Sequence, residues 1–98
     1  MRVSAQRSAD GRTLALHASR AMVAGTNQSY ELWLIPAEGG NPISLAVLGA
    51  LDARLVLQES ERQRLRTGAT LAVSVEPSGG SPTGKPTGPV ILTGRING

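Results

Sequence analysis

The chain has 98 residues, which is the usual length of one domain, and we expect residues 1–98 to fold as a single unit. Aliphatic side chains must form most of the core, because the sequence has no Phe, one Tyr and one Trp. The lack of cysteine excludes disulfides, thiol catalysis and thiolate metal sites. A net charge of +3 and frequent apolar segments argue against a disordered chain.

The basic residues do not gather in one part of the sequence. Ten Lys and Arg residues outnumber seven Asp and Glu residues, but in segment 54–66 four arginines alternate with Glu59 and Glu61. Polyanion binding requires a surface of one sign, and single-strand binding also requires stacking aromatics. We therefore expect no nucleic-acid partner.

The N-terminal residues predict a β-hairpin. Val3–Ala5 and Thr13–His17 flank Asp10-Gly11, a dipeptide typical of tight hairpin turns. Alternation along the second strand places Leu14 and Leu16 toward the core and His17 on the opposite face. Small and polar residues follow, and they predict a connection over 18–29.

Tyr30–Ile35 predicts a strand at the centre of a sheet, because it is apolar at consecutive positions and is followed by Pro36. Trp33 lies within it and is interpreted as a core residue rather than a sugar-stacking platform. Further strands are predicted at 43–47, 53–57, 70–76 and 89–93, and Leu71, Val73 and Val75 are expected to point inward.

One short helix is predicted near residues 60–66. Ser60 is a suitable N-cap, the arginines favour the C-terminal end, and Gly68 is placed to end the helix. About seven short strands and this helix, with turn residues at regular intervals, predict an all-β fold, an antiparallel β-sandwich.

A long loop, Pro77–Gly88, separates the last two predicted strands. Its four glycines and three prolines would suit a flexible linker, but its position between two patterned strands indicates an internal loop. Glu76 precedes it and has two readings. The carboxylate either lies in solvent at the strand end, or accepts hydrogen bonds from backbone N–H groups of the loop.

Residues suited to catalysis are few. His17 is the only histidine, and we interpret it as a partly exposed strand residue, because a metal site needs three or four ligands. Glu59 and Glu61 are two positions apart, so they diverge on a helix and form no carboxylate pair. We predict no catalytic, metal or cofactor site, and therefore no enzyme.

Four segments, taken in this order, resemble the C-terminal domain of the anti-sigma-K factor family. They are Tyr30–Pro36, Pro42–Leu45, Ala72–Thr83 and Thr87–Leu92. The resemblance marks a set of motif residues that we expect to be structural rather than ligand-binding: Tyr30, Trp33, Pro36, Glu76, Pro77, Gly79, Gly80, Ser81, Pro82, Thr87, Gly88 and Pro89.

The resemblance implies a parent protein with three parts. A cytoplasmic segment binds a sigma factor, one transmembrane helix follows, and the present domain lies on the extracytoplasmic side of the bacterial inner membrane. Successive proteases, the second of them within the membrane, then release the sigma factor. In such a negative regulator of transcription, the outer domain is a sensor or a shield against proteases.

The sigma-binding segment and the transmembrane helix have no counterpart in these residues. We therefore expect a soluble chain that binds neither sigma factor nor zinc, with membrane contact only through the missing helix. Two other classes remain: a generic extracytoplasmic β-sandwich that binds a ligand or a protein, and an enzyme, which lacks a credible set of residues. Exposed strand edges could also pair two copies into a homodimer.

Overall fold

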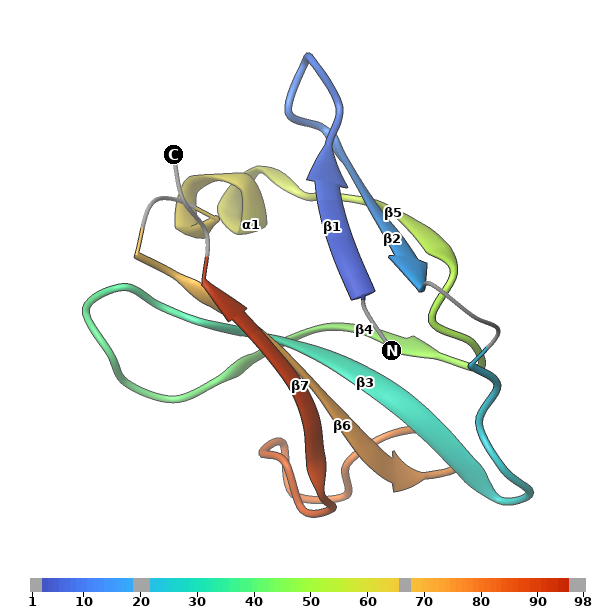
Figure 1. The fold of residues 1–98 in the computed structure, drawn as a ribbon. Coiled ribbons are helices and arrows are strands. Elements are labelled where there is room, and N and C mark those ends of the chain that lie inside the picture. The colour runs from blue at the N-terminus through green and yellow to red at the C-terminus, as the bar shows by residue number, and fades with distance from the viewer. Residues whose placement is uncertain (1–2, 19–21, 66–67, 96–98) are drawn as a thin grey trace.

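The computed structural model describes residues 3–18, 22–65 and 68–95, which form seven strands and one helix. Two antiparallel sheets result, one of order β1-β2-β5 and one of order β4-β3-β6-β7 (Figure 1). The prediction of an all-β fold with about seven strands and one short helix is confirmed. The elements are β1 (Val3–Arg7), β2 (Thr13–Ala18), β3 (Gln28–Ile35), β4 (Ile43–Leu48), β5 (Ala53–Val56), α1 (Glu59–Arg64), β6 (Thr70–Pro77) and β7 (Val90–Arg95).

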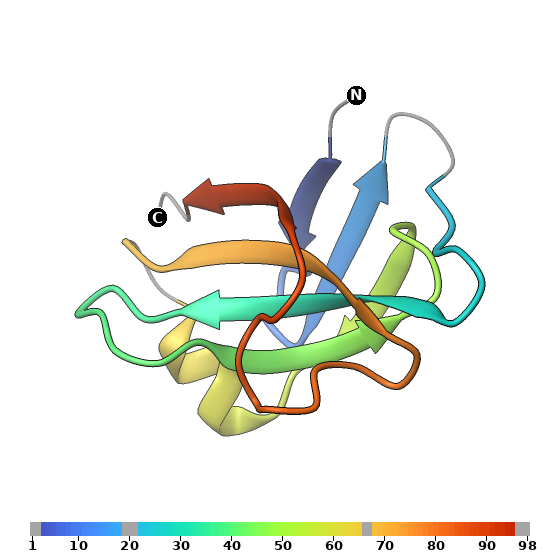
Figure 2. The same cartoon turned by 90° about the horizontal axis from the view of Figure 1, so that it is seen from below.

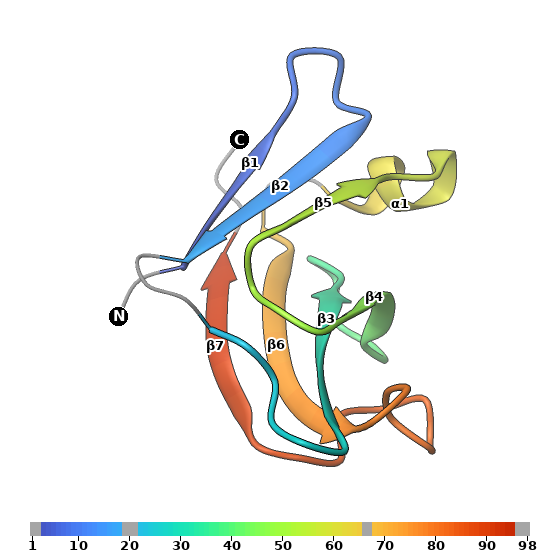
Figure 3. The same cartoon turned by 90° about the vertical axis from the view of Figure 1, so that its right-hand side faces the viewer.

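The two sheets enclose one apolar core between them (Figure 3). The chain leaves the larger sheet after β4 and enters the smaller one at β5, so β6 returns to pair with β3 instead of β4. Strands distant in sequence are thereby joined across the same core. Its buried members are Leu14, Leu16, Ala18, Tyr30, Leu32, Leu34, Leu51, Leu57, Leu65, Ala69 and Val73.

The predicted inward faces of β2 and β6 are confirmed. Leu14 and Leu16 are buried in the core, whereas His17, on the other face of β2, is exposed. In β6, Val73 is buried, and its partly buried neighbours Leu71 and Val75 also pack against the core.

β3 lies inside the larger sheet and is buried on both faces, as its sequence predicted. It pairs with β6 without interruption from Gln28↔Pro77 to Ile35↔Thr70. Leu32 and Leu34 belong to the core cluster between the sheets. Residues that alternate with them therefore point to the outer face of this sheet, and there Glu31 and Trp33 are also buried.

The helix begins earlier than predicted, and the assignment of Ser60 as N-cap is wrong. Gln58 is the N-cap, and its backbone N–H donates to the Glu61 carboxylate at 2.8 Å, so the capping interaction forms two residues before Ser60. The helix ends at Arg64, before the predicted stop at Gly68. Leu65 follows it and is buried in the core, which fixes this short helix to the sheets.

Replacing Leu34 with alanine should lower the free energy of unfolding by about 2–5 kcal/mol, because the removed side chain is fully buried and leaves a cavity in the core. Val56→Ala is the matched control, since Val56 is 83% exposed and should cost less than about 0.5 kcal/mol. Urea denaturation followed by circular dichroism measures both. Equal losses in the two variants would contradict the placement of the core.

Candidate functional site

The segment between β6 and β7, residues 78–89, crosses the outer face of the larger sheet (Figure 2). We call it the strap. It is an internal loop held against β3 and β6, as its position in the sequence predicted. The outer face that it crosses holds the buried polar side chains of the described residues: Ser29, Glu31, Ser74 and Glu76.

Glu76, at the end of β6, holds the C-terminal part of the strap. The side chain is 2% exposed, and Oε2 accepts hydrogen bonds from the backbone N–H of Thr87 at 3.0 Å and of Gly88 at 3.3 Å. The Thr87 hydroxyl donates to Oε1, and the Ser74 hydroxyl donates to Oε2 at 2.6 Å. Of the two readings of Glu76, the solvent-exposed strand end is wrong, and the carboxylate that accepts loop N–H groups is confirmed.

These contacts keep Glu76 ionised. Burial raises the pKa of the Glu76 carboxyl, but hydrogen bonds from the hydroxyls of Ser74 and Thr87 and from the backbone of Gly88 and Thr87 lower it by more. The pKa therefore lies below its ordinary value of 4.5. At neutral pH the strap is bound to a carboxylate, and such charge-assisted hydrogen bonds are stronger than neutral ones.

Glu31, in β3, holds the N-terminal part of the strap. It is 5% exposed, and Oε1 accepts the backbone N–H of Ser81 at 2.7 Å, while Oε2 accepts the hydroxyl of Ser44 from β4. The role of Glu31 was not predicted from the sequence. The available signal was a charged residue within a strand predicted to be buried on both faces, because a buried carboxylate requires hydrogen-bond donors.

Trp33 lies on the outer face of the larger sheet and not between the two sheets. Its side chain is fully buried on the outer face, and Nε1 donates to the Ser74 hydroxyl at 2.8 Å. Because Ser74 in turn donates to Glu76, the indole, the hydroxyl and the carboxylate form one hydrogen-bonded chain that ends on the strap. The prediction that Trp33 is buried is confirmed, although its layer is a second one outside the main core.

Two strap glycines are required by close contacts. A Cβ on Gly88 would lie 1.7 Å from the backbone oxygen of Val75, so any side chain there would displace the strap from β6. Gly80 has a φ of +102°, and a Cβ would lie 2.9 Å from Val47. The remaining motif residues lie in β3, just after it, within the strap or at its ends: Tyr30, Pro36, Pro77, Gly79, Ser81, Pro82 and Pro89.

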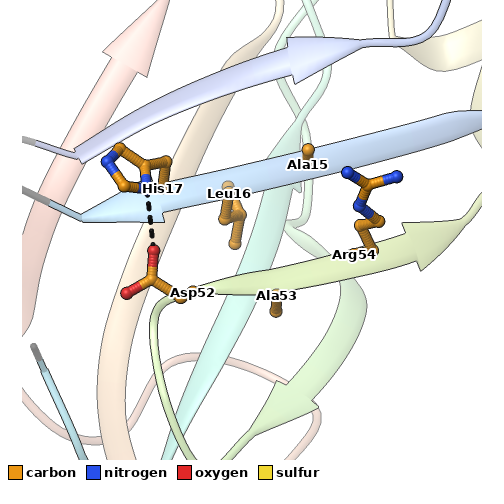
Figure 4. A pocket seen from close by; sticks show the side chains of 6 residues that line it. All are labelled: Ala15, Leu16, His17, Asp52, Ala53 and Arg54. Atoms are coloured by element: carbon orange, nitrogen blue, oxygen red, sulfur yellow. Dashed lines mark ion pairs between the residues drawn. The ribbon is translucent and has the colours of Figure 1, made fainter.

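A second polar group lies on the exposed face of the smaller sheet. His17 Nδ1 is 3.0 Å from Asp52 Oδ1, and the Ala18 backbone N–H also donates to this oxygen at 3.1 Å. The pair borders a shallow groove with Ala15 and Arg54 (Figure 4). The His17 side chain is 78% exposed, which fits its interpretation as a strand residue on an open face.

In the described ranges 3–18, 22–65 and 68–95, no group of three or more His, Cys, Asp or Glu side chains could hold a metal ion. In the same ranges, no helix is long and apolar enough to cross a membrane.

Fold and site together define an all-β domain in which buried carboxylates hold a glycine-rich loop against a sheet. The family profile described as Anti-sigma-K factor rskA, C-terminal, matches residues 1–90. The chain therefore belongs to this family of anti-sigma factor C-terminal domains, as the four sequence segments indicated. Neither the curated proteins nor the solved structures contain a significant match.

Replacing Glu76 with glutamine should lower the free energy of unfolding at neutral pH by about 1.5–3 kcal/mol, because the amide cannot accept all of the hydrogen bonds that end on the carboxylate. Glu59→Gln is the control for loss of one charge, since Glu59 makes only a surface ion pair with Arg62 and should contribute less than about 1 kcal/mol. Guanidinium denaturation compares the variants. If both lose equally little, Glu76 does not hold the strap.

The stability of the chain should also fall in acid. The pKa of Glu76 in the folded chain is below its ordinary value of 4.5, so as the pH falls the unfolded chain binds the proton first. The ionised carboxylate therefore stabilises the folded state fully above about pH 4.5. This contribution is lost as the pH falls through the folded-state pKa. Asp10, whose pKa is lowered by the Ser8 hydroxyl, adds a dependence of the same sign in every variant. Denaturation curves from about pH 7 to pH 3 should therefore show a steeper loss for the parent sequence than for Glu76→Gln; parallel losses would contradict this role.

Proposed function

We propose that this chain is the extracytoplasmic regulatory domain of a membrane-anchored anti-sigma factor, and that its folded state shields the protein from proteases that would release the sigma factor. Residues 1–98 act as one domain in this proposal. The sigma factor is bound by another segment of the parent protein, on the other side of the membrane.

Family membership supports the regulatory part of the proposal. An anti-sigma factor family implies a sigma factor as the partner of the whole protein, and its C-terminal domain has a regulatory rather than an enzymatic role. The exposed pair of His17 and Asp52 supplies no nucleophile, and it gives no reason to assign a reaction.

The observation that carries the shielding role is the burial of β3 on both faces. The core covers Leu32 and Leu34, Glu31 and Trp33 are buried on the outer face that the strap crosses, and the strand is paired with β4 on one side and β6 on the other. A protease needs access to backbone, and access to a folded chain follows either its opening equilibrium or its unfolding rate. Backbone in this position becomes available only after the domain opens.

The proposal also accounts for sensitivity to a signal. Domains of this size have marginal stability, so a signal that weakens the fold by ~2–3 kcal/mol raises the open fraction by roughly 30- to 150-fold. The signal need not bind a deep pocket to have this effect, because any contact that destabilises the folded state acts through the same equilibrium.

Val73→Ala in the full-length anti-sigma factor should imitate the signal, because it leaves a cavity in the core and raises the open fraction. We expect faster cleavage of the protein on immunoblots and higher transcription from a reporter that depends on its sigma factor. Val56→Ala, at a position that is 83% exposed, should change neither. The shield would be refuted by a Val73→Ala protein that is measurably less stable yet is cleaved and regulated as before.

A further inference from the structure

We infer that the strap opens before the rest of the domain does, and that the first proteolytic cut falls within it, at residues 78–89. This inference rests on the shielding function proposed above and assigns the segment at which the shield fails first.

Hydrogen bonds attach the strap to β3, to β6 and to the turn before β3. The Ser78 N–H donates to the Asn27 carbonyl at 2.9 Å, and the Gly79 N–H donates to the Ser29 hydroxyl at 3.2 Å. Ser81 is held by Glu31, Thr87 and Gly88 are held by Glu76, and the Pro89 carbonyl accepts the Val75 N–H at 2.9 Å. Each of these groups can exchange its partner for water when the strap lifts, so each bond adds much less to the free energy of opening than its strength in isolation.

No residue of the strap belongs to the core between the sheets. Lifting it therefore leaves the packing of Leu32, Leu34 and Val73 intact. Local opening of this kind requires less free energy than global unfolding, because the core between the sheets stays packed. The strap is also continuous in sequence, so it can move as one unit between the ends of β6 and β7.

The closed strap is exposed at its tip but is a poor protease substrate. Glu31 holds Ser81 and Glu76 holds Thr87. The free part of the closed strap is therefore the short span 82–86 between these two residues. Within this span the Ser81 hydroxyl donates to the Lys85 carbonyl and accepts the Thr83 N–H, so the tip is folded into a turn. Peptides commonly bind to proteins as extended strands, and loss of both carboxylate contacts would free all of 78–89 to extend.

The only tryptophan is linked to the strap through a hydrogen-bonded chain. Trp33 is 0% exposed, its Nε1 donates to the Ser74 hydroxyl, and Ser74 donates to the Glu76 carboxylate that accepts the strap N–H groups, so we expect Trp33 to become more accessible when the strap lifts. Its fluorescence therefore reports strap opening separately from global unfolding, which circular dichroism reports.

The test is Gly88→Ala in the 98-residue chain. The new Cβ would meet the Val75 oxygen at 1.7 Å and should force the strap away from β6. Gly94→Ala in β7 is the matched control, because a Cβ there has no neighbour within 4 Å. We expect Gly88→Ala to keep a β-sheet circular dichroism spectrum, to show several-fold stronger acrylamide quenching of Trp33, and to be cut by subtilisin roughly tenfold faster than Gly94→Ala.

Mass spectrometry of the first fragments then locates the cut. Ends within 78–89, in both the parent sequence and Gly88→Ala, support the inference. First cuts elsewhere, or equal quenching and cleavage rates in Gly88→Ala and Gly94→Ala, overturn it.

If Gly88→Ala does not fold, Thr87→Val is the milder variant. It removes only the hydroxyl donor to Glu76 and should give a smaller increase in quenching and in cleavage at the same sites. No increase in Thr87→Val would again overturn it.

The two proposals fail in different ways. If first cuts fall outside the strap while Val73→Ala still raises cleavage and sigma-dependent transcription in the full-length protein, the strap inference is wrong and the shield stands. If neither Val73→Ala nor Gly88→Ala changes transcription in the full-length protein, the shielding function fails, even where the purified chain is cut within 78–89.

Discussion

The pairing of β3 with β6 is the interaction on which the rest of the structure depends. Their uninterrupted register places Leu32 opposite Val73 on the core face and Glu31 opposite Ser74 on the outer face. Because successive side chains of a strand point to opposite faces, a slip of one residue would place Glu31 in the apolar core and Leu32 beneath the strap. One register thus determines both the core and the polar layer outside it.

A glycine-rich strap explains why that outer layer is polar. The strap has few side chains that could bury apolar surface, so its path must be set through its backbone, and backbone N–H groups require acceptors on the sheet. Glu31 and Glu76 provide these acceptors. Burying a carboxylate is costly unless donors surround it, and among the described residues every buried side-chain nitrogen or oxygen has a hydrogen-bond partner. The polar layer therefore specifies one path for a segment whose composition would otherwise suit a flexible linker.

Patterns that act over short distances were sufficient to predict most of the strands. Alternation identified the inward face of β2, and the position of Glu76 next to the loop suggested its hydrogen bonds before the structure showed them.

The role of Glu31 was not predicted, because its donor Ser81 lies 50 positions away and is brought near only by the return of β6 to β3. The face occupied by Trp33 could not be predicted either, since β3 is apolar at consecutive positions and both of its faces are covered. The start of α1 was predicted at the wrong residue. Ser60 is intrinsically the better N-cap, but Gln58 takes this position because the Glu61 carboxylate accepts the Gln58 backbone N–H.

The two layers have different physical origins, and this difference bears on how a regulatory domain of the anti-sigma-K family could respond to a signal. The core gains its stability from apolar burial and is lost cooperatively, whereas the strap is held to the outer layer by hydrogen bonds whose groups can also bind water. β7, which follows the strap, is an edge strand held by its pairing with β6. A cut within 78–89 would therefore break the chain without removing the packing of β2, β3 and β6, and β7 would stay attached through this pairing and through Leu92, which packs against the core. Cleavage and complete unfolding are in this way separable events, because the segment that opens at low cost is not the segment that supplies most of the stability.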